Sequence, residues 1–420
     1  MLAGLTGKHI ARAGRLGSGP APGPNAGASD MSNVSMQRRT LLAASLASAL
    51  PAHAATPFLA GGDISALTWM ERAGAVYQDR DGKPGDCLAL LKRYGHNIAR
   101  IRLYDKTGPG TGNDGWYWPE GSMDLPDVLA LARRAKAQGM QIQFTFHYSD
   151  FWTNSKTQDP PTAWRRELSQ LPDNTARFKR LLVLVEQRTR EVMQALVDQG
   201  TAPEFVSLGN EIELGMLYPY GSTKVWPLLG ALLKVGYAAV KAVSPTSRVV
   251  LHLDDGGNEA KYVDWFDNAR AQGVKWDVIG PSYYPFWTKK SVSQLASFCE
   301  VVAKRYDSDL LIMEAGFNFA PKRHDGWPGQ LEHNGPYPAS MSTPEGQRDF
   351  MAELLGAMKA TPRVLGVLYW DPIMISNPKV GWALKEGTGQ PGPNVVSNTT
   401  LFDFQGKALP VLDIWKQYTQ

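Results

Sequence analysis

Residues 125–149 read LPDVLALARRAKAQGMQIQFTFHYS, and this stretch predicts the fold. In its first half, apolar side chains recur at helical spacing: Leu125, Val128, Leu129, Ala132 and Ala135. The helical pattern Leu125–Gln138 stops at Gly139, a residue common just after a helix end. An apolar run over Gln141–Ser149 follows at once and predicts a buried strand. We therefore expect a unit in which a helix packs on a parallel strand, as in α/β proteins.

The same alternation extends in both directions along the chain. Eight apolar runs predict strands: Phe58–Ser65, Asn97–Tyr104, Gln141–Ser149, Glu204–Glu211, Arg248–Asp255, Val278–Pro285, Asp309–Phe317 and Val364–Pro372. Helical patterns lie between them, among them Phe178–Gln199, Leu228–Val243 and a helix opened by Thr343-Pro344. Eight strand–helix units predict an α/β fold of the (β/α)8 TIM-barrel type. The alternative, an open doubly wound sheet, needs a Gly-rich phosphate turn or a break in the alternation, and the sequence contains neither.

Composition excludes several classes of protein. Of the 420 residues 43% are hydrophobic, and 44 Lys and Arg against 40 Asp and Glu give a net charge of +4. That charge is too weak to predict nucleic acid or a membrane as a partner. The two cysteines, Cys87 and Cys299, are expected as buried free thiols, with a disulfide after export as the alternative. Few Cys and seven His leave little room for a structural zinc site.

The first 54 residues are predicted to precede the folded domain, residues 55–420. Residues 1–35 lack an apolar period, and we expect them to be disordered or to lie upstream of a start at Met31 or Met36. Residues 36–54 combine Arg38-Arg39, an apolar run over 41–50 and Ala52-His53-Ala54, which is typical of a signal peptide, and the paired Arg favours the twin-arginine route. The run is too short to span a bilayer, and no later stretch is expected to do so. We predict a secreted or periplasmic protein.

In a (β/α)8 barrel, functional side chains lie at the C-terminal ends of the strands. Polar and aromatic residues gather at those ends here: His147, Asp150, Trp152, Asn210, Glu211, Asp254, Tyr283, Trp287, Glu314, Trp370 and Asp371. On the second strand, Arg100 and Arg102 share one face at the strand period of two. We therefore predict one shared active site at this end of the barrel.

Glu211 and Glu314 close two strongly apolar strands, the fourth and the seventh, which lie across the barrel mouth from each other. A carboxylate is costly at the end of a buried strand unless it has a partner or a task. Two carboxylates facing across a cleft are what retaining glycoside hydrolysis requires. Beside them, Asn210 is expected to bind a sugar hydroxyl, Tyr283 to donate to the nucleophile and Trp370 to stack on a sugar ring.

These motifs resemble the clan A glycoside hydrolases and, within that clan, glycoside hydrolase family 53, the arabinogalactan endo-β-1,4-galactanases. The likeness runs from about residue 58 to the end, and FHYSDFW (146–152) and SYYPFW (282–287) are its most specific strings. The other matching segments are Gly61–Ser65, Arg100–Leu103, Leu208–Ile212, Gly215–Pro219, Leu251–Asp254 and Leu401–Phe404. The resemblance implies retaining, internal cleavage of β-1,4-galactan, as found in pectin side chains and type I arabinogalactan.

The resemblance also implies roles for individual residues. Glu211 would be the acid/base and Glu314 the nucleophile. The sugar at the cleaved bond would be lined by Arg102, His147, Asn210, Tyr283 and Trp370. Nearby support or further subsites would come from Asp150, Trp152, Asp254 and Trp287.

Three features depart from the family pattern. Asp371 stands where the family usually has Glu after the Trp of strand eight, and Ala315 stands where it usually has Thr. The loop Asn318–Pro338 does not match the acidic calcium-binding loop of some relatives. Because the loop does not support calcium, we predict no metal. Two carboxyls suffice for the chemistry, so we predict no organic cofactor. We expect a polysaccharide as the partner, and a monomer.

Three other functions remain as alternatives. A clan A enzyme acting on cellulose or mannan would share the fold and the carboxylate pair. An inactive carbohydrate-binding barrel would fit the loss of either Glu, but both are present. A metal-dependent hydrolase would need two His close together at a strand end, and the sequence has no such pair.

Overall fold

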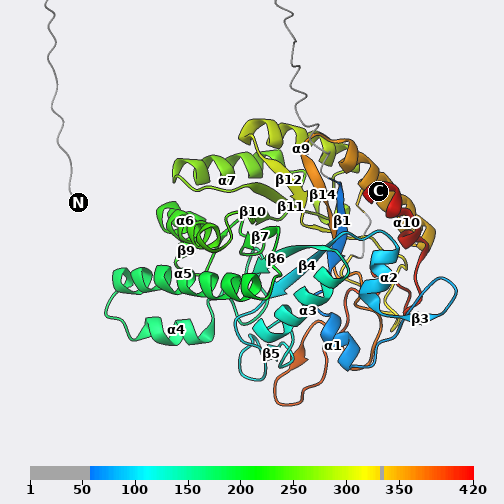
Figure 1. Ribbon diagram of the computed structural model, residues 1–420, viewed down its shortest axis with the longest axis horizontal. Coiled ribbons are helices and arrows are strands. Elements are labelled where there is room, and N and C mark those ends of the chain that lie inside the picture. The colour runs from blue at the N-terminus through cyan, green and yellow to red at the C-terminus, as the bar shows by residue number, and fades with distance from the viewer. Residues whose placement is uncertain (1–56, 332–334) are drawn as a thin grey trace, which may run out of the picture. The chain divides into compact units, whose positions relative to one another are not determined.

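Eight parallel strands close on themselves into a barrel, and helices cover its outside (Figure 1). The computed structural model describes residues 57–331 and 335–420, which belong to one compact unit. Around the barrel the strands follow the order β1-β4-β6-β7-β10-β11-β12-β14, and β14 pairs with β1 to close the ring. The predicted (β/α)8 barrel is confirmed, and an open sheet is excluded.

All eight predicted strand runs contain a barrel strand. The strands are β1 (Leu59–Asp63), β4 (Ile98–Leu103), β6 (Gln141–Phe146), β7 (Phe205–Leu208), β10 (Arg248–Leu253), β11 (Val278–Tyr283), β12 (Asp309–Ile312) and β14 (Val364–Tyr369). Each predicted run is longer than its strand at the C-terminal end. Most of the polar residues there follow the barrel strand and turn into the loops that form the site, whereas Glu314 remains paired with β11.

Helices connect the strands on the outside. They are α1 (Leu67–Arg72), α2 (Cys87–Arg93), α3 (Leu125–Ala137), α4 (Thr162–Ser169), α5 (Asn174–Asp198), α6 (Trp226–Val243), α7 (Glu259–Ala271), α8 (Pro285–Thr288), α9 (Val292–Tyr306), α10 (Pro344–Ala360) and α11 (Lys416–Thr419). Thr343 caps α10 as predicted, because its hydroxyl accepts from the Gly346 N–H. Helix α5 begins before the predicted Phe178, because Asp173 caps its first turn.

Short strand pairs shape the loops at the barrel ends. They are β2 (Tyr77–Gln78) with β3 (Pro84–Gly85), β5 (Trp116–Tyr117) with β15 (Leu384–Lys385), and β8 (Gly215–Met216) with β9 (Gly221–Ser222); β13 (Glu314–Ala315) extends the seventh barrel strand and pairs with β11. The β5–β15 pair joins the loops after the second and eighth barrel strands. It therefore builds one wall of the site from segments far apart in the sequence.

Helix α6 corrects one expectation. With its preceding turn, Thr223–Val243, it is long and apolar enough to cross a membrane by length and composition, which the sequence analysis did not expect. In the structure its apolar residues Leu229, Leu232, Leu233 and Val240 are buried, and the helix packs on α5 and β7. This packing against the barrel accounts for its composition.

Cys87 and Cys299 are buried free thiols, as expected. The predictions for residues 1–54, namely the upstream segment and the signal peptide, lie outside the described residues.

Two glycines let neighbouring strands of the barrel approach each other. A Cβ at Gly61 in β1 would lie 1.7 Å from the Ile98 carbonyl oxygen of β4, and one at Gly366 in β14 would lie 2.0 Å from the Leu59 carbonyl oxygen. Real atoms do not approach that closely, so any larger residue must push the strands apart. The two contacts lie on the two sides of β1, the strand at which the barrel closes.

We expect Gly61→Ala to lower the free energy of unfolding by about 1–3 kcal/mol or more, because the added methyl overpacks the β1–β4 seam. The matched control is Gly356→Ala in α10, where a Cβ would meet the Tyr418 ring at an ordinary 3.6 Å. Since alanine favours a helix over glycine, the control should be neutral or stabilising by about 0.5–1 kcal/mol. Denaturant unfolding of both variants measures the difference, and equal effects would contradict the packing argument.

Candidate active site

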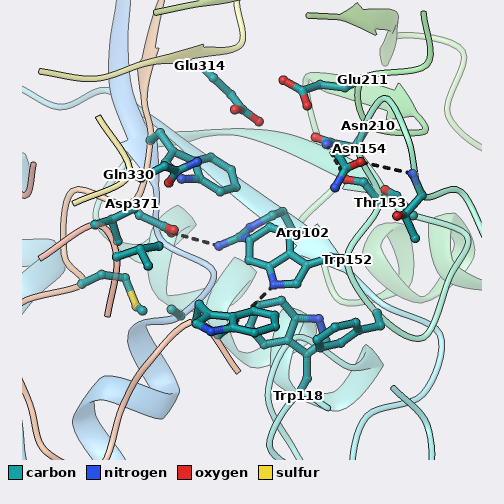
Figure 2. A pocket seen from close by; sticks show the side chains of 18 of the residues that line it. Arg102, Trp118, Trp152, Thr153, Asn154, Asn210, Glu211, Glu314, Gln330 and Asp371 are labelled. Carbon is teal, nitrogen blue, oxygen red and sulfur yellow. Dashed lines mark hydrogen bonds and ion pairs between the residues drawn. The ribbon is translucent and has the colours of Figure 1, made fainter. Parts of the chain in front are cut away.

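A cavity of about 540 Å³ opens at the C-terminal end of the barrel. Figure 2 shows Glu211 and Glu314 approaching each other across it, with Arg102 and tryptophan rings below. A carboxylate oxygen of Glu211 lies within 4.8 Å of one of Glu314. The predicted carboxylate pair therefore faces a common gap at the separation typical of two groups acting on one bond.

Glu211 is held by an unusual turn after β7. Gly209 has φ +88° and Glu211 itself has φ +48°, a conformation that residues with a side chain rarely adopt. The Gln158 side chain locks this turn, since its amide donates to the carbonyls of Asn210 at 2.8 Å and Glu211 at 3.2 Å. Such backbone strain persists where the surroundings over-determine it, and here it aims the carboxyl at the cavity.

One oxygen of Glu211 is fixed by a short hydrogen-bonded chain. The Ser282 hydroxyl donates to Glu211 Oε1 at 2.9 Å, and Ser282 Oγ lies 2.8 Å from His252 Nε2. Because the serine proton points at Glu211, the serine oxygen accepts from His252, which places the imidazole proton on Nε2. Both His252 and Ser282 are buried in the barrel interior. Glu211 itself lines the cavity.

The pKa of Glu211 lies well above its usual range. Burial is the largest cause, and the negative charges of Glu314, Glu213 and Asp254 add to it; the Ser282 hydroxyl opposes it. A raised pKa lets a carboxyl keep its proton to higher pH, which suits a general acid.

Glu314 has different partners. Arg100 Nη1 donates to its Oε1 at 2.6 Å, and the Tyr284 hydroxyl donates to its Oε2 at 3.0 Å. Both oxygens therefore act as acceptors, one of them in a charge-assisted bond. The same guanidinium donates through Nη2 to Asn210 Oδ1 at 2.7 Å, so Arg100 ties the residue before Glu211 to Glu314.

The two arginines of β4 form the base of the site. Both point into the barrel and are almost completely buried. Asp63 lies 3.6 Å from Arg100 Nε and 3.0 Å from Arg102 Nε, and Arg102 Nη2 donates to Asp371 Oδ1 at 2.9 Å. Asp371 thus reaches its arginine although it is one methylene shorter than the family's usual Glu. Burial raises the pKa of Asp371 to about 7, while Arg102 opposes that shift.

Tryptophan rings form the wall on the β5–β15 side of the cavity. Trp152 packs on Trp118 with ring centroids 4.7 Å apart, and its indole N–H donates to the Trp382 carbonyl at 3.3 Å. Trp370 lies against the Arg102 guanidinium, 4.5 Å from its carbon to the ring centroid. Aromatic faces of this kind suit the apolar faces of sugar rings. Trp287 lies in the cavity wall and is half exposed.

Most of the predicted site residues meet in this cavity. Those that line it are Arg102, Trp152, Asn210, Glu211, Trp287, Glu314 and Trp370. His147 is buried next to it, stacks on Tyr104 and shares a 2.6 Å hydrogen bond with Thr153, which does line the cavity. Asp150 lies outside the cavity wall, where it accepts from the N–H groups of Lys106 and Thr162.

Tyr283 and Asp254 also lie outside the cavity lining. The expectation that Tyr283 donates to Glu314 is wrong, because its hydroxyl donates to the Lys290 carbonyl at 2.9 Å and its neighbour Tyr284 makes that bond. Side chains alternate along a strand, so Ser282 and Tyr284 point inward and Tyr283 points outward. Asp254 accepts from Lys261 at 2.7 Å and lines a separate hollow.

Four residues of the site are not among those predicted from the sequence: Tyr284, Ser282, His252 and Asp63. The strand period of two could have identified Tyr284, because it lies two residues after Ser282 and shares the same face of the strand. Nothing in the sequence identifies the His252–Ser282 contact, because it joins two strands through side chains alone.

Glu211, His252 and Glu314 also have the spacing of a metal site. The donor set does not fit one, because the arginine guanidinium already lies 2.6 Å from Glu314. Ser282 also occupies the facing atoms of His252 and Glu211. A cation would have to displace both groups and sit against the positive charge of Arg100.

A (β/α)8 barrel with paired carboxylates and an aromatic wall at its C-terminal mouth defines a glycosidase. The model of glycosyl hydrolase family 53 matches residues 59–415, and the chain belongs to that family. The chain is 29% identical over 394 residues to the endo-beta-1,4-galactanase of Bacillus subtilis, covering 86% of each. It is 32% identical over 342 residues to a probable arabinogalactan endo-beta-1,4-galactanase A of Aspergillus terreus, covering 79% of this chain and 90% of the relative.

A solved structure shows the same likeness. The catalytic domain of a family 53 protein from Ignisphaera aggregans superposes with a TM-score of 0.76 at 30% identity, covering 89% of this chain and 98% of the other.

Ser282→Ala tests the predicted acid role of Glu211. The serine hydroxyl stabilises the ionised form of Glu211, so its removal raises the pKa of that carboxyl. A general acid works while protonated, so activity is lost as the pH rises through its pKa. The high-pH limb of kcat/KM should therefore move upward, by up to about one pH unit.

The matched control is Ser247→Ala, a buried serine that donates to the Pro203 carbonyl at the start of β10, away from the site. Its pH profile should equal that of the wild type. A downward shift in Ser282→Ala would contradict the assignment.

Proposed function

We propose that this protein is an endo-acting, retaining glycoside hydrolase that cleaves β-1,4-galactosidic bonds in galactan and type I arabinogalactan. The observation that carries the proposal is the contrast between the two facing carboxyls, Glu211 and Glu314. Membership of family 53 and the printed activities of the relatives support the substrate. The carboxylate spacing supports retention, since a pair this close leaves no room for a water between inverting partners.

The partners of each carboxyl support its role. In the first step Glu314 attacks the anomeric carbon while Glu211 gives its proton to the leaving oxygen, so a glycosyl ester forms as the glycosidic bond breaks. In the second step Glu211 takes a proton from water, and the water oxygen replaces Glu314 at the anomeric carbon. Glu314 accepts two hydrogen bonds and suits the nucleophile; Glu211 has a raised pKa and suits the acid.

The remaining residues of the cavity bind and orient the sugar. Asn210 and Arg102 present polar groups to it, and Trp370, Trp152 and Trp287 present ring faces. His147 acts through Thr153 as a positioning residue. Acid/base and nucleophilic catalysis by two carboxyls is chemically sufficient for this reaction, so we propose no organic cofactor and no metal, and we expect the monomer to act alone.

The substrate is tested by reducing-sugar release from linear β-1,4-galactan, carboxymethylcellulose and mannan. We expect activity on galactan alone, falling by at least about 10³-fold in Glu314→Gln because the nucleophile is lost. Glu353→Gln, on the outside of α10, is the control for removing one carboxylate. Activity on cellulose or mannan instead would overturn the galactanase proposal and leave the barrel and the carboxyl pair.

We also propose that residues 36–54 direct export. The paired Arg38 and Arg39, the apolar run and the Ala52-His53-Ala54 site support this. In a host with the twin-arginine route, the wild type should appear outside the cytoplasm with a mature N-terminus near residue 55. Replacing both arginines with Lys should retain the precursor inside; export of that variant would contradict the twin-arginine route, and an unprocessed wild type would contradict the signal peptide.

A further inference from the structure

A second hollow of about 460 Å³ lies on the Glu211 side of the barrel mouth. Two chain segments run from the active-site cavity into it. Asn154 and Thr157 line the cavity, whereas Ser155 and Lys156 between them line the hollow. Likewise Glu211 lines the cavity, and Glu213 and Leu214 line the hollow. The two spaces are thus neighbours that share one rim.

The chemistry of cleavage indicates on which side of the scissile bond this rim lies. The acid protonates the leaving oxygen, so the part of the substrate that leaves first lies on the acid's side of the scissile bond. Figure 2 shows Glu211, Asn210 and Asn154 together along one side of the cavity, with Trp118 and Trp152 on another. A polysaccharide chain that passes the acid therefore continues over residues 154–157 and 211–214 toward the second hollow.

The hollow combines apolar faces with charged groups of both signs. Leu214 is 52% exposed, and Trp226 is half-buried with its ring edge-on to Trp265, 5.3 Å between centroids. Lys156 and Lys261 line it together with Asp254, Asp264 and Glu213, so charges of both signs are mixed at the rim. Apolar ring faces amid polar groups of both signs suit a neutral sugar better than an ionic ligand.

An unsatisfied polar group lies at the base of the hollow. Glu213 is 7% exposed, and its Oε2 accepts from the Asp254 N–H at 3.2 Å. Its Oε1 is buried without a hydrogen-bond partner among the described residues. Lys156, in contrast, is exposed and makes no ion pair within the part of the chain that the structure describes. The Lys156 ammonium is therefore free to bind the hydroxyls of a ligand.

We propose that this hollow, formed by Lys156, Glu213, Leu214 and Trp226, is a distal subsite for a neutral sugar of the leaving portion of the substrate. The proposal rests on the proposed function, because the direction of the chain follows from Glu211 acting as the acid. It makes the enzyme favour long chains, since a sugar held there contributes binding energy that short substrates lack.

The test compares two substrates. Linear β-1,4-galactan extends over both sides of the scissile bond, whereas 4-nitrophenyl β-1,4-galactobioside carries only the aryl group on the leaving side. In Trp226→Ala the ratio of kcat/KM on galactan to kcat/KM on the aryl substrate should fall about 3- to 10-fold, the range expected for one aromatic contact. Lys156→Ala should lower the same ratio, and this exposed residue carries little risk to folding.

Trp327→Ala is the control, because Trp327 is 68% exposed and lies in the loop before α10, outside both spaces. Its ratio should equal that of the wild type. An unchanged ratio in both Trp226→Ala and Lys156→Ala, whether both rates fall together or neither falls, would overturn the subsite. A wild type inactive on both substrates would overturn the proposed function, and with it this inference; a wild type active on both keeps the two questions separate.

Discussion

The site depends on two arginines buried side by side inside the barrel. Arg100 and Arg102 are almost fully removed from water, which is costly unless every charge has a partner. Asp63, Glu314 and Asp371 supply those partners from the first, seventh and eighth barrel strands. The network therefore joins three strands to β4, and it can form only when the barrel has closed. Folding and the placement of Glu314 are in this way one event.

Arg100 also explains how two carboxyls of the same type reach different states. It binds Glu314 and, through Asn210, the turn that carries Glu211, but it does not contact Glu211 itself. Glu211 instead meets a neutral serine, a buried surrounding and the negative charge of Glu314, which together raise its pKa. The strained turn at Gly209–Glu211 holds it in this environment. In the proposed assignment, the surroundings of the two residues, and not the residue type, distinguish the nucleophile from the acid.

Much of this could be predicted from the sequence. The parts that could not be predicted have a physical cause in common. Apolar runs and helix ends identify all eight strands, because burial on both faces leaves a strong signal. Positions at strand ends also predict three residues of the site, Glu211, Glu314 and Trp370. The prediction for Tyr283 is wrong because its position at a strand end places it near the site but does not give the direction of its side chain. That direction depends on the strand period of two, and the Tyr283 hydroxyl points to the Lys290 carbonyl instead. Asp150 and Asp254 are bound by local donors, a helix N–H and a lysine, that position alone cannot reveal.

The central claim is that Glu314 attacks the sugar and Glu211 moves the proton, and trapping with azide tests it most directly. With an activated aryl galactobioside, Glu314→Gly leaves a space on the nucleophile's face, so added azide should give the α-glycosyl azide. Glu211→Gly keeps the nucleophile, so azide should attack the glycosyl enzyme and give the β-glycosyl azide. Nuclear magnetic resonance of the two products distinguishes the anomers. The reverse assignment, β from Glu314→Gly and α from Glu211→Gly, would contradict the account.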